Sequence, residues 1–343
     1  MRRYVGVDYH RDYSYMTVMD QQGQIMQEGR VENQQAAVAE FLTRAHCDGN
    51  ASAVLEAGRN WTVMHDWLEE LVDEVKLAHP LKVKLIAEAK IKTDKIDARV
   101  LAHLLRTDLV PEAYVARPQA REVRGVLRQR MFLVRLRTMV KNRIRTLLDR
   151  YPSLTATCPT DDRFSRAARG WLQQVALKPT DRTLVDDDLR LLDELEAHIA
   201  TTETLVATLA AGDARVTLLK TIPGLGDFFA VLIAYEVDDI TRFAHQKKFF
   251  SYMGLVPSTQ SSGGRTFHGR LTRQGNKYLR WAFVEAVWPA IRTDRGLRAY
   301  YEQLKTRKGV NPAKIATARR LATIVYRVLS QRRPYRVEGP GRP

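Results

Sequence analysis

The sequence is poor in cysteine and contains no long apolar run. Cys47 and Cys158 are the only cysteines among 343 residues, and they lack metal-ligand spacing. We therefore expect two reduced packing residues in a cytoplasmic protein. No apolar stretch reaches the roughly 18–20 residues that cross a bilayer. The N-terminus also enters a strand without the apolar core of a secretion signal. These absences argue against a membrane protein and a secreted one.

Acidic residues are outnumbered by basic ones. The chain has 55 Lys and Arg against 39 Asp and Glu, a net charge of +16 with a pI near 9.9. Such a surplus indicates a polyanionic partner. Without a membrane segment or a lipidation motif, nucleic acid is favoured over a membrane surface. A merely basic protein without such a partner is the alternative, and only local clustering of the charge weighs against it.

The N-terminal third alternates short strands with helices. The pattern predicts strands over 3–8, 13–19, 25–31, 51–55 and 74–78, and helices over 33–45, 61–72 and from Pro80 toward Lys92. This order predicts a mixed α/β domain over residues 1–115.

Four acids stand at special points of that pattern. Asp8 ends the first strand and Glu56 follows the fourth, while Asp94 and Asp97 begin a helix with Thr93 as its N-cap. Residues three apart on a helix are neighbours, about 5–6 Å apart at Cβ. Together the four carboxylates predict a site for one or two Mg²⁺ ions. The alternative is two strand-end acids and a helix start whose dipole favours acids.

A long basic helix is expected over 118–150, within a central region of long helices or coiled coil at 116–211. It carries ten basic residues against Glu122 and Asp149. The candidate phosphate contacts are Arg121, Arg124, Arg128, Arg135, Lys141 and Arg145. A solvated connector helix is the alternative. A second helix over 183–209 has near-heptad leucines, which predict a hairpin with the basic helix or a coiled coil between subunits.

The C-terminal part, residues 212–331, reads as a helical domain. Thr221–Gly226 precedes an apolar helix and is typical of a helix-hairpin-helix turn, in which Gly224 and Gly226 let backbone N–H groups approach phosphate. An ordinary helix–helix turn fits equally well. Closing helices are expected over 276–291, 296–306 and 311–329, followed by a disordered tail at 332–343.

A stretch rich in glycine and hydroxyl groups runs from Pro257 into a basic segment. Its arginines Arg265, Arg270 and Arg273 are suited to clamp phosphate oxygens. An ATP-binding loop is rejected, because Arg270-Leu271 replaces the required Lys-Ser/Thr and no strand is expected before it. A serine here is either a nucleophile toward phosphorus or an ordinary residue of a flexible surface loop.

Residues 4–8, 52–58, 91–105, 221–226 and 253–280 together resemble one family. It is the DEDD-type insertion-sequence transposases, which are related to pilin-gene invertases and are recognised as bridge-RNA-guided recombinases. Its specific markers are Lys92–Ala98 and Ser262-Gly263. The resemblance implies a RuvC-like domain of ribonuclease-H-like fold over 1–115, with Asp8, Glu56, Asp94 and Asp97 as metal ligands. It also implies a helical transposase domain over 212–331 whose nucleophile is Ser262, with Ser261 as the neighbour that could be mistaken for it.

The resemblance further implies what the protein does. Its expected activity is Mg²⁺-dependent cleavage and exchange of DNA strands through a serine nucleophile, directed by a guide RNA. Its expected partners are donor and target DNA, the RNA, and further copies of the chain in a dimer or tetramer. Two alternatives remain open: a structure-selective nuclease that uses water as nucleophile, and a non-catalytic nucleic-acid-binding protein.

Overall fold

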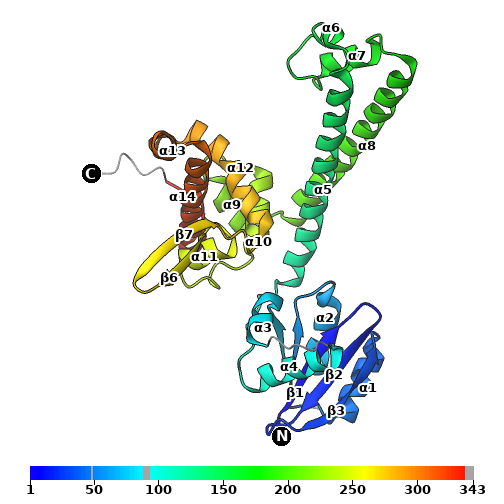
Figure 1. Cartoon of the computed structure of the whole chain (residues 1–343), viewed down its shortest axis with the longest axis vertical. Coiled ribbons are helices and arrows are strands. Elements are labelled where there is room, and N and C mark those ends of the chain that lie inside the picture. The colour runs from blue at the N-terminus through cyan, green and yellow to red at the C-terminus, as the bar shows by residue number, and fades with distance from the viewer. Residues whose placement is uncertain (48, 88–92, 337–343) are drawn as a thin grey trace. The chain divides into compact units, whose positions relative to one another are not determined.

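The computed structural model describes residues 1–47, 49–87 and 93–336 (Figure 1). The chain divides into two units, Met1–Val115 and Ala116–Pro343. Lys92 of the predicted acidic motif and residues 337–343 of the expected tail lie outside the described residues. Within the described part of the chain, no helix has both the length and the apolarity that a membrane span needs.

A five-stranded sheet organises the first unit. The strands are β1 (Arg3–Tyr9), β2 (Tyr13–Met19), β3 (Ile25–Glu32), β4 (Ala51–Glu56) and β5 (Glu74–Ala78), in the spatial order β3-β2-β1-β4-β5. The first three form an antiparallel meander, whereas β4 runs parallel to β1 and β5 parallel to β4. The predicted mixed α/β domain is confirmed, and its sheet is consistent with a ribonuclease-H-like fold.

Helices cover both faces of this sheet, which explains why its central strands are apolar throughout. Helices α1 (Gln35–Arg44) and α2 (Trp61–Leu71) pack on one face in a cluster with Val5 and Val7. On the other face, α3 (Pro80–Ile86) and α4 (Asp94–Arg106) pack in a cluster with Val54. Strands buried on both sides lack the polar alternation of a half-exposed sheet. The fold therefore has three layers, with α4 lying against β1 and β2.

Two long helices form a hairpin at the start of the second unit. These are α5 (Pro118–Leu148) and α8 (Pro179–Leu209), with the short helices α6 (Pro152–Thr155) and α7 (Arg166–Gln174) between them (Figure 1). Leu189, Leu192, Leu195 and Ile199 of α8 are buried in clusters with residues of α5. The predicted hairpin within one chain is confirmed, although α8 begins four residues earlier than the leucine pattern indicated.

The rest of the second unit is a helical domain with one hairpin. Its elements are α9 (Ala214–Lys220), α10 (Asp227–Val237), α11 (Gln246–Tyr252), β6 (Pro257–Ser262), β7 (Arg265–Leu271), α12 (Lys277–Thr293), α13 (Arg295–Lys308) and α14 (Val310–Gln331). Tyr235, Phe249 and Phe283 are among its largest buried side chains. The three predicted closing helices are confirmed as α12, α13 and α14.

Two expectations for this unit need correction. The hydroxyl-rich stretch is an antiparallel β-hairpin rather than a loop, because Gly263 and Gly264 form a two-residue turn with positive φ at both positions. Contrary to the prediction, a strand, β6, precedes the glycines. The tail is also held at its beginning: the Tyr335 hydroxyl donates to Asp294 Oδ2 at 2.7 Å, so residues 332–336 are not a free extension.

Candidate active site

The first two acids end neighbouring parallel strands. Val7 of β1 is paired with Leu55 of β4, and Asp8 and Glu56 are the next residue of each strand. Parallel strands bring their carboxyl ends to the same edge of a sheet. The strand register therefore places Asp8 and Glu56 at adjacent positions on this edge.

Helix α4 brings the other two acids to β1. Thr93 caps it, because its Oγ1 accepts a hydrogen bond from the Ile96 backbone N–H at 3.3 Å, as predicted. Asp94 and Asp97 lie in the first turn. The helix backbone rests directly on Gly6: a Cβ there would lie 2.0 Å from the Ala98 carbonyl oxygen. Only glycine permits this approach, two residues before Asp8.

A network of ion pairs links α4 to strand β3 of the sheet. Glu28 of β3 accepts two hydrogen bonds from the Arg99 guanidinium, both at 2.8 Å, and pairs with Lys95 Nζ at 2.6 Å. The Arg99 hydrogen bonds, with help from Lys95, lower the pKa of Glu28 to about 2. Both cations come from the first half of α4, so the network also orients the start of the helix.

Two of the four acids meet at a histidine. His10 Nε2 lies 3.0 Å from Asp8 Oδ2 and 3.3 Å from Asp94 Oδ1. The Tyr13 hydroxyl donates to Asp94 Oδ2 at 2.7 Å, and the His10 and Tyr13 rings are 5.1 Å apart between centroids. Asp8, His10 and Asp94 each offer a ligand atom, and these atoms all lie within 4.8 Å of one another.

The pKa values of Asp8 and Asp94 are shifted in opposite directions. Burial raises the pKa of Asp8, the charges of Asp97 and Asp94 add to that rise, and His10 opposes it. The Tyr13 hydrogen bond lowers the pKa of Asp94 despite its partial burial. The mutual repulsion of these acids is what a bound cation would relieve. Carboxylate oxygens so grouped are the ligands that hard divalent cations prefer, so the residues fit such an ion.

The structure brings the predicted acids together unequally. Asp8 and Asp94 share the cluster, Asp97 lies close enough for its charge to act on Asp8, and Glu56 stands at the neighbouring strand end. Sequence reasoning missed His10 and Tyr13. His10 has a weak signal, because residues two apart in an extended chain face the same side and Asp8 is two residues away. Tyr13 has none, since only the turn between β1 and β2 brings it near Asp94.

The candidate serine lies in the second unit, at the end of β6. Ser262 is paired with Arg265 across the hairpin, and Ser261 is paired with Thr266. Ser261 Oγ lies 3.0 Å from Thr266 Oγ1, so the two hydroxyls hydrogen-bond to each other. Because neighbouring residues in a strand point to opposite faces, Ser262 projects on the other side of the hairpin with Arg265.

Comparison with known proteins agrees with this arrangement. Residues 5–152, which include all four acids, match the DEDD transposase model of IS110 type, and residues 216–302, which include Ser262, match the model described as "Transposase IS116/IS110/IS902 family". The chain belongs to the IS110 family of transposases. The confirmed resemblance thus extends over both units of the structure.

Individual relatives support the assignment along nearly the whole length. This IS110-family chain is 29% identical to a "Probable family 20 transposase" of Pseudomonas aeruginosa, over 79% of the chain and 82% of that protein. It is 23% identical to the "Transposase for insertion sequence element IS1111A" of Coxiella burnetii, over 97% and 91%. It is 24% identical to an insertion element IS116 uncharacterized protein of Streptomyces clavuligerus, over 97% and 96%.

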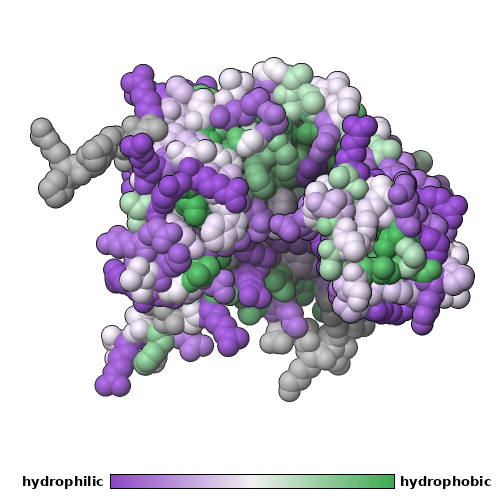
Figure 2. All heavy atoms as spheres, turned by 90° about the horizontal axis from the view of Figure 1, so that it is seen from above, coloured by the Kyte–Doolittle hydropathy of each residue, from purple (hydrophilic) through white to green (hydrophobic). Residues whose placement is uncertain are grey.

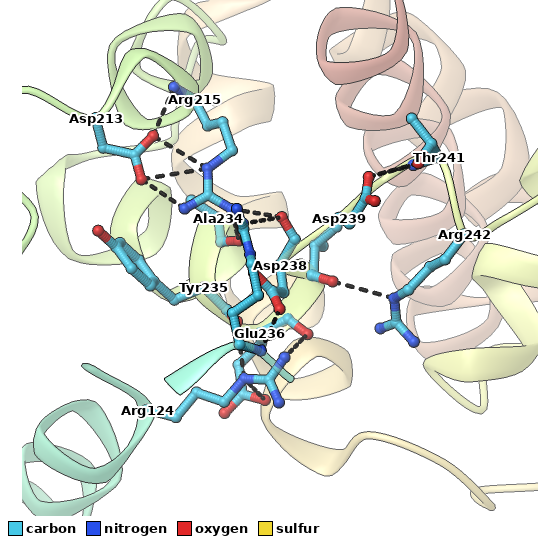
Figure 3. A network of polar contacts seen from close by, with 12 residues as sticks. Arg124, Asp213, Arg215, Ala234, Tyr235, Glu236, Asp238, Asp239, Thr241 and Arg242 are labelled. Carbon is cyan, nitrogen blue, oxygen red and sulfur yellow. Dashed lines mark hydrogen bonds and ion pairs between the residues drawn. The ribbon is translucent and has the colours of Figure 1, made fainter. Parts of the chain in front are cut away.

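Several basic side chains of α5 in this transposase make internal contacts. Arg124 donates to the Tyr235 and Glu236 carbonyl oxygens at 2.8 and 3.0 Å (Figure 3). Arg128 donates to both carboxylate oxygens of Glu236, a fully buried side chain that also accepts from Asn276 Nδ2 at 2.7 Å. Removing either arginine would leave part of a buried charge uncompensated. Their contacts explain their presence without any phosphate.

Helix α8 compensates much of the remaining charge of α5. Its acids form ion pairs with three bases of α5: Arg130–Glu203, Lys141–Glu196 and Arg143–Asp188. The self-repulsion expected of this basic helix is therefore reduced by its partner in the hairpin. Of the predicted contacts, Arg128, Arg135 and Arg145 are exposed, whereas Arg121, Arg124 and Lys141 are half-buried. Arg145 hydrogen-bonds Asn142 and lies over the Phe164 ring.

The positive surplus is concentrated in the second unit. Residues 1–115 have 14 basic and 18 acidic side chains, whereas residues 212–343 have 24 and 9. Of the latter acids, Glu236, Asp238 and Asp294 are buried. Hydrophilic side chains cover most of the face in Figure 2, with smaller hydrophobic patches between them. Arg265, Arg270 and Arg273 are all exposed.

The two glycines of the predicted phosphate turn have different surroundings. A Cβ at Gly224 would lie 2.4 Å from the Ala290 backbone nitrogen of α12, and its φ is +86°. Close helix packing therefore explains this glycine, as the ordinary helix–helix turn would require. Gly226, the N-cap of α10, would meet nothing within 4 Å among the described residues. A phosphate contact in this turn therefore rests on Gly226 and the α10 N-terminus.

Proposed function

We propose that this transposase cleaves and rejoins DNA strands in a metal-assisted reaction whose nucleophile is Ser262. The observation that carries the proposal is the meeting of Asp8 and Asp94 at His10, within the part of the chain that matches the DEDD model. Neighbouring carboxylates with perturbed pKa values are typical of functional sites, and their oxygen atoms are the ligands that divalent cations prefer.

The acidic site holds one or two divalent cations, with Mg²⁺ proposed as the natural ion. Asp8, Glu56, Asp94 and Asp97 supply the oxygen ligands. When bound, the ion supplies positive charge that polarises a phosphate and stabilises charge on the leaving oxygen. Tyr13 holds Asp94 ionised and oriented through its hydrogen bond, and His10 keeps Asp8 and Asp94 at a fixed separation before the ion arrives.

Ser262 forms the bond to phosphorus. Its Oγ attacks the scissile phosphodiester, the new seryl O–P bond forms, and the P–O bond to the departing DNA end breaks. The serine proton is lost to a base or solvent, and the departing oxygen is protonated in turn. One phosphodiester is exchanged for another, so a second strand end can displace the serine without ATP. Arg265 and Arg270 would neutralise the charge on the phosphate.

The partners are donor DNA, target DNA and a guide RNA. Base pairing with the guide would choose the target sequence, while the exposed basic side chains would hold backbone phosphates and make binding strongly salt-dependent. Assembly of a dimer or tetramer on the nucleic acid belongs to the same proposal. Sequencing the RNA that co-purifies with the chain tests the guide, and absence of complementarity to any insertion junction would contradict it.

A covalent-trapping experiment tests the nucleophile. After incubation with target DNA and Mg²⁺, a denaturing gel should show a protein–DNA adduct that Ser262→Ala abolishes. Ser261→Ala is the matched control, since it removes the adjacent hydroxyl and should keep the adduct. Cleavage without any adduct would favour the nuclease that uses water. Unchanged activity in Asp8→Asn and Asp94→Asn would favour a non-catalytic binding protein; we expect both to lose about 100-fold or more.

A further inference from the structure

The serine hairpin has two chemically different faces. Paired residues of an antiparallel ladder project on the same side, and residues two apart in a strand share a face. The register pairs Ser262 with Arg265 and Gln260 with Phe267. Ser262, Arg265 and Phe267 therefore lie on one face, while Ser261 and Thr266 lie on the other. A nucleophile, a cation and an aromatic ring follow one another along this face.

Packing does not explain Phe267, which with Phe132 of α5 (54% exposed) is one of two phenylalanines more than half exposed among the described residues. It is 66% exposed, whereas Phe249 and Phe283 of the same unit are fully buried. None of the hydrophobic clusters formed by the described residues includes it. A phenyl ring on an exposed two-stranded hairpin gains little from burial within the chain and leaves its apolar faces in water.

The surroundings of the ring indicate an anionic occupant. Arg265 precedes it by two residues, about 6.6–6.8 Å along an extended strand, and lies on the same face. The domain over 212–343 carries 24 basic and 9 acidic side chains. The hairpin tip is open, since neither Gly263 nor Gly264 would meet an atom within 4 Å among the described residues. A nucleic-acid strand combines phosphates for Arg265 with a flat base for the ring.

We propose that Phe267 stacks on an unpaired DNA base next to the phosphate that Ser262 attacks. This rests on the proposed function for the role of Ser262, and it adds the state of the substrate: the strand is unstacked at this point. In an intact duplex the neighbouring bases cover both faces of a base, so a ring can stack only where the strand is single or opened. Arg265 holds the phosphate while Phe267 fixes the position of the nucleotide beside it.

Binding measurements on the full chain test the stacking. The probes are an oligothymidylate of about 20 nucleotides, enough to span a single-strand binding site, and a strand of equal length whose nucleotides are all abasic. We expect Phe267→Ala to weaken binding of oligothymidylate at least about fivefold, the lower end for one base–aromatic stack. Binding of the abasic strand should not change, and Phe267→Trp should restore affinity. Leu109→Ala removes a 60% exposed apolar side chain in the first unit and is the matched control.

Three outcomes would overturn the proposal. Unchanged affinity of Phe267→Ala for oligothymidylate would show that the ring does not stack on a base. An equal loss of affinity for both strands would show that the ring contributes to binding without contacting a base. A change in oligomeric state caused by Phe267→Ala, without a difference between the strands, would assign the ring to contact with a second copy. The measurement requires no cleavage, so a negative trapping result with Ser262 would leave this test unaffected.

Discussion

The acid cluster depends on a few side chains that no metal-ligand pattern would include. Tyr13 and His10 contact Asp94 and Asp8 directly. The Tyr13 hydrogen bond lowers the pKa of Asp94, whereas burial raises the pKa of Asp8 although His10 opposes that rise. Asp94 remains ionised with the help of a donated hydrogen bond, while Asp8 is the carboxylate that binds a proton more readily. A pH profile of activity should therefore depend on both residues.

Tyr13→Phe should shift the acid side of that profile. The substitution removes the hydrogen bond that lowers the pKa of Asp94, so this pKa rises and a larger fraction of Asp94 is protonated at low pH. Activity should fall most at acidic pH and recover as the pH is raised. Cleavage rates measured from about pH 3.5 to 7, a range that includes the ordinary pKa of an aspartate, check this, with Tyr4→Phe on the same sheet as the control. An equal loss of cleavage activity at every pH would mean that the Tyr13 hydroxyl does not act through the pKa of Asp94.

Gly6→Ala should damage the site without touching an acid. The new Cβ would lie 2.0 Å from the Ala98 carbonyl oxygen, so α4 must move away from β1 and carry Asp94 and Asp97 with it. Overpacking of this kind costs about 1–3 kcal/mol. Thermal unfolding and titration with Mn²⁺ measure the two effects.

Gly29→Ala is the matched control for Gly6→Ala. It lies on the same sheet, and its Cβ would meet only Phe41 Cε2 at 3.9 Å, an ordinary contact. Its unfolding temperature and metal affinity should stay near those of the parent chain. Equal effects at both positions would point to a general loss of strand stability rather than to the separation of α4 and β1.

Many basic side chains of the long helix α5 form ion pairs with the elements packed against it. The ten bases in 118–150, nine of them in α5, look like a phosphate-binding surface. However, α8 supplies acids for several of them and Glu236 of α10 binds two more. Such ion pairs leave fewer guanidinium groups for nucleic acid. The exposed Arg135 is the best remaining candidate on this helix.

Arg135→Ala and Arg124→Ala should therefore have opposite effects. Arg135→Ala should lower the slope of log K against log salt for DNA binding by about 1, and leave stability unchanged. Arg124→Ala should leave that slope unchanged and destabilise the chain by about 1–3 kcal/mol, because the Glu236 region loses buried hydrogen bonds. Salt titrations and urea unfolding of both variants check this. A reduced slope for Arg124→Ala would reassign it to the DNA interface.

The molecule separates its charge between its two units. The first unit has more acidic than basic residues and carries the proposed metal site, whereas the second has the entire positive surplus and carries Ser262. We therefore expect nucleic acid and the cation to bind to different parts of the chain, so that each can be removed without the other.

Asp8→Asn should therefore separate binding from cleavage. Because the second unit supplies the electrostatic attraction, the variant should bind DNA within about twofold of the parent chain, a change of less than 0.5 kcal/mol by the usual conversion. It should nevertheless fail to cleave. The double variant Arg265→Ala, Arg270→Ala should behave in the opposite way, because its first effect should be the loss of DNA binding rather than of cleavage. A large loss of affinity in Asp8→Asn would assign DNA binding to the acidic site.

The elements of this protein were largely predictable from local pattern. Alternating apolar residues, Thr93 as a cap and the apolar closing helices predicted strands and helices close to those observed, and the positions of Asp8, Glu56, Asp94 and Asp97 within them. The hairpin at Ser262 was missed because its strands are polar and exposed, so they lack the hydrophobic alternation that marks a strand. The Gly-Gly turn was the available signal.

What the sequence determined by itself is most of the helices and strands and the family, because caps, periodicity and motif spacing are local properties of the chain. Only the tertiary structure decided which charges are free. The pairing of Arg124 with Glu236, the contact of His10 and Tyr13 with the acids, and the exposure of Phe267 all depend on residues distant in the chain. The energy of a charge or a ring is set by what surrounds it in space, and no pattern along the chain contains that information.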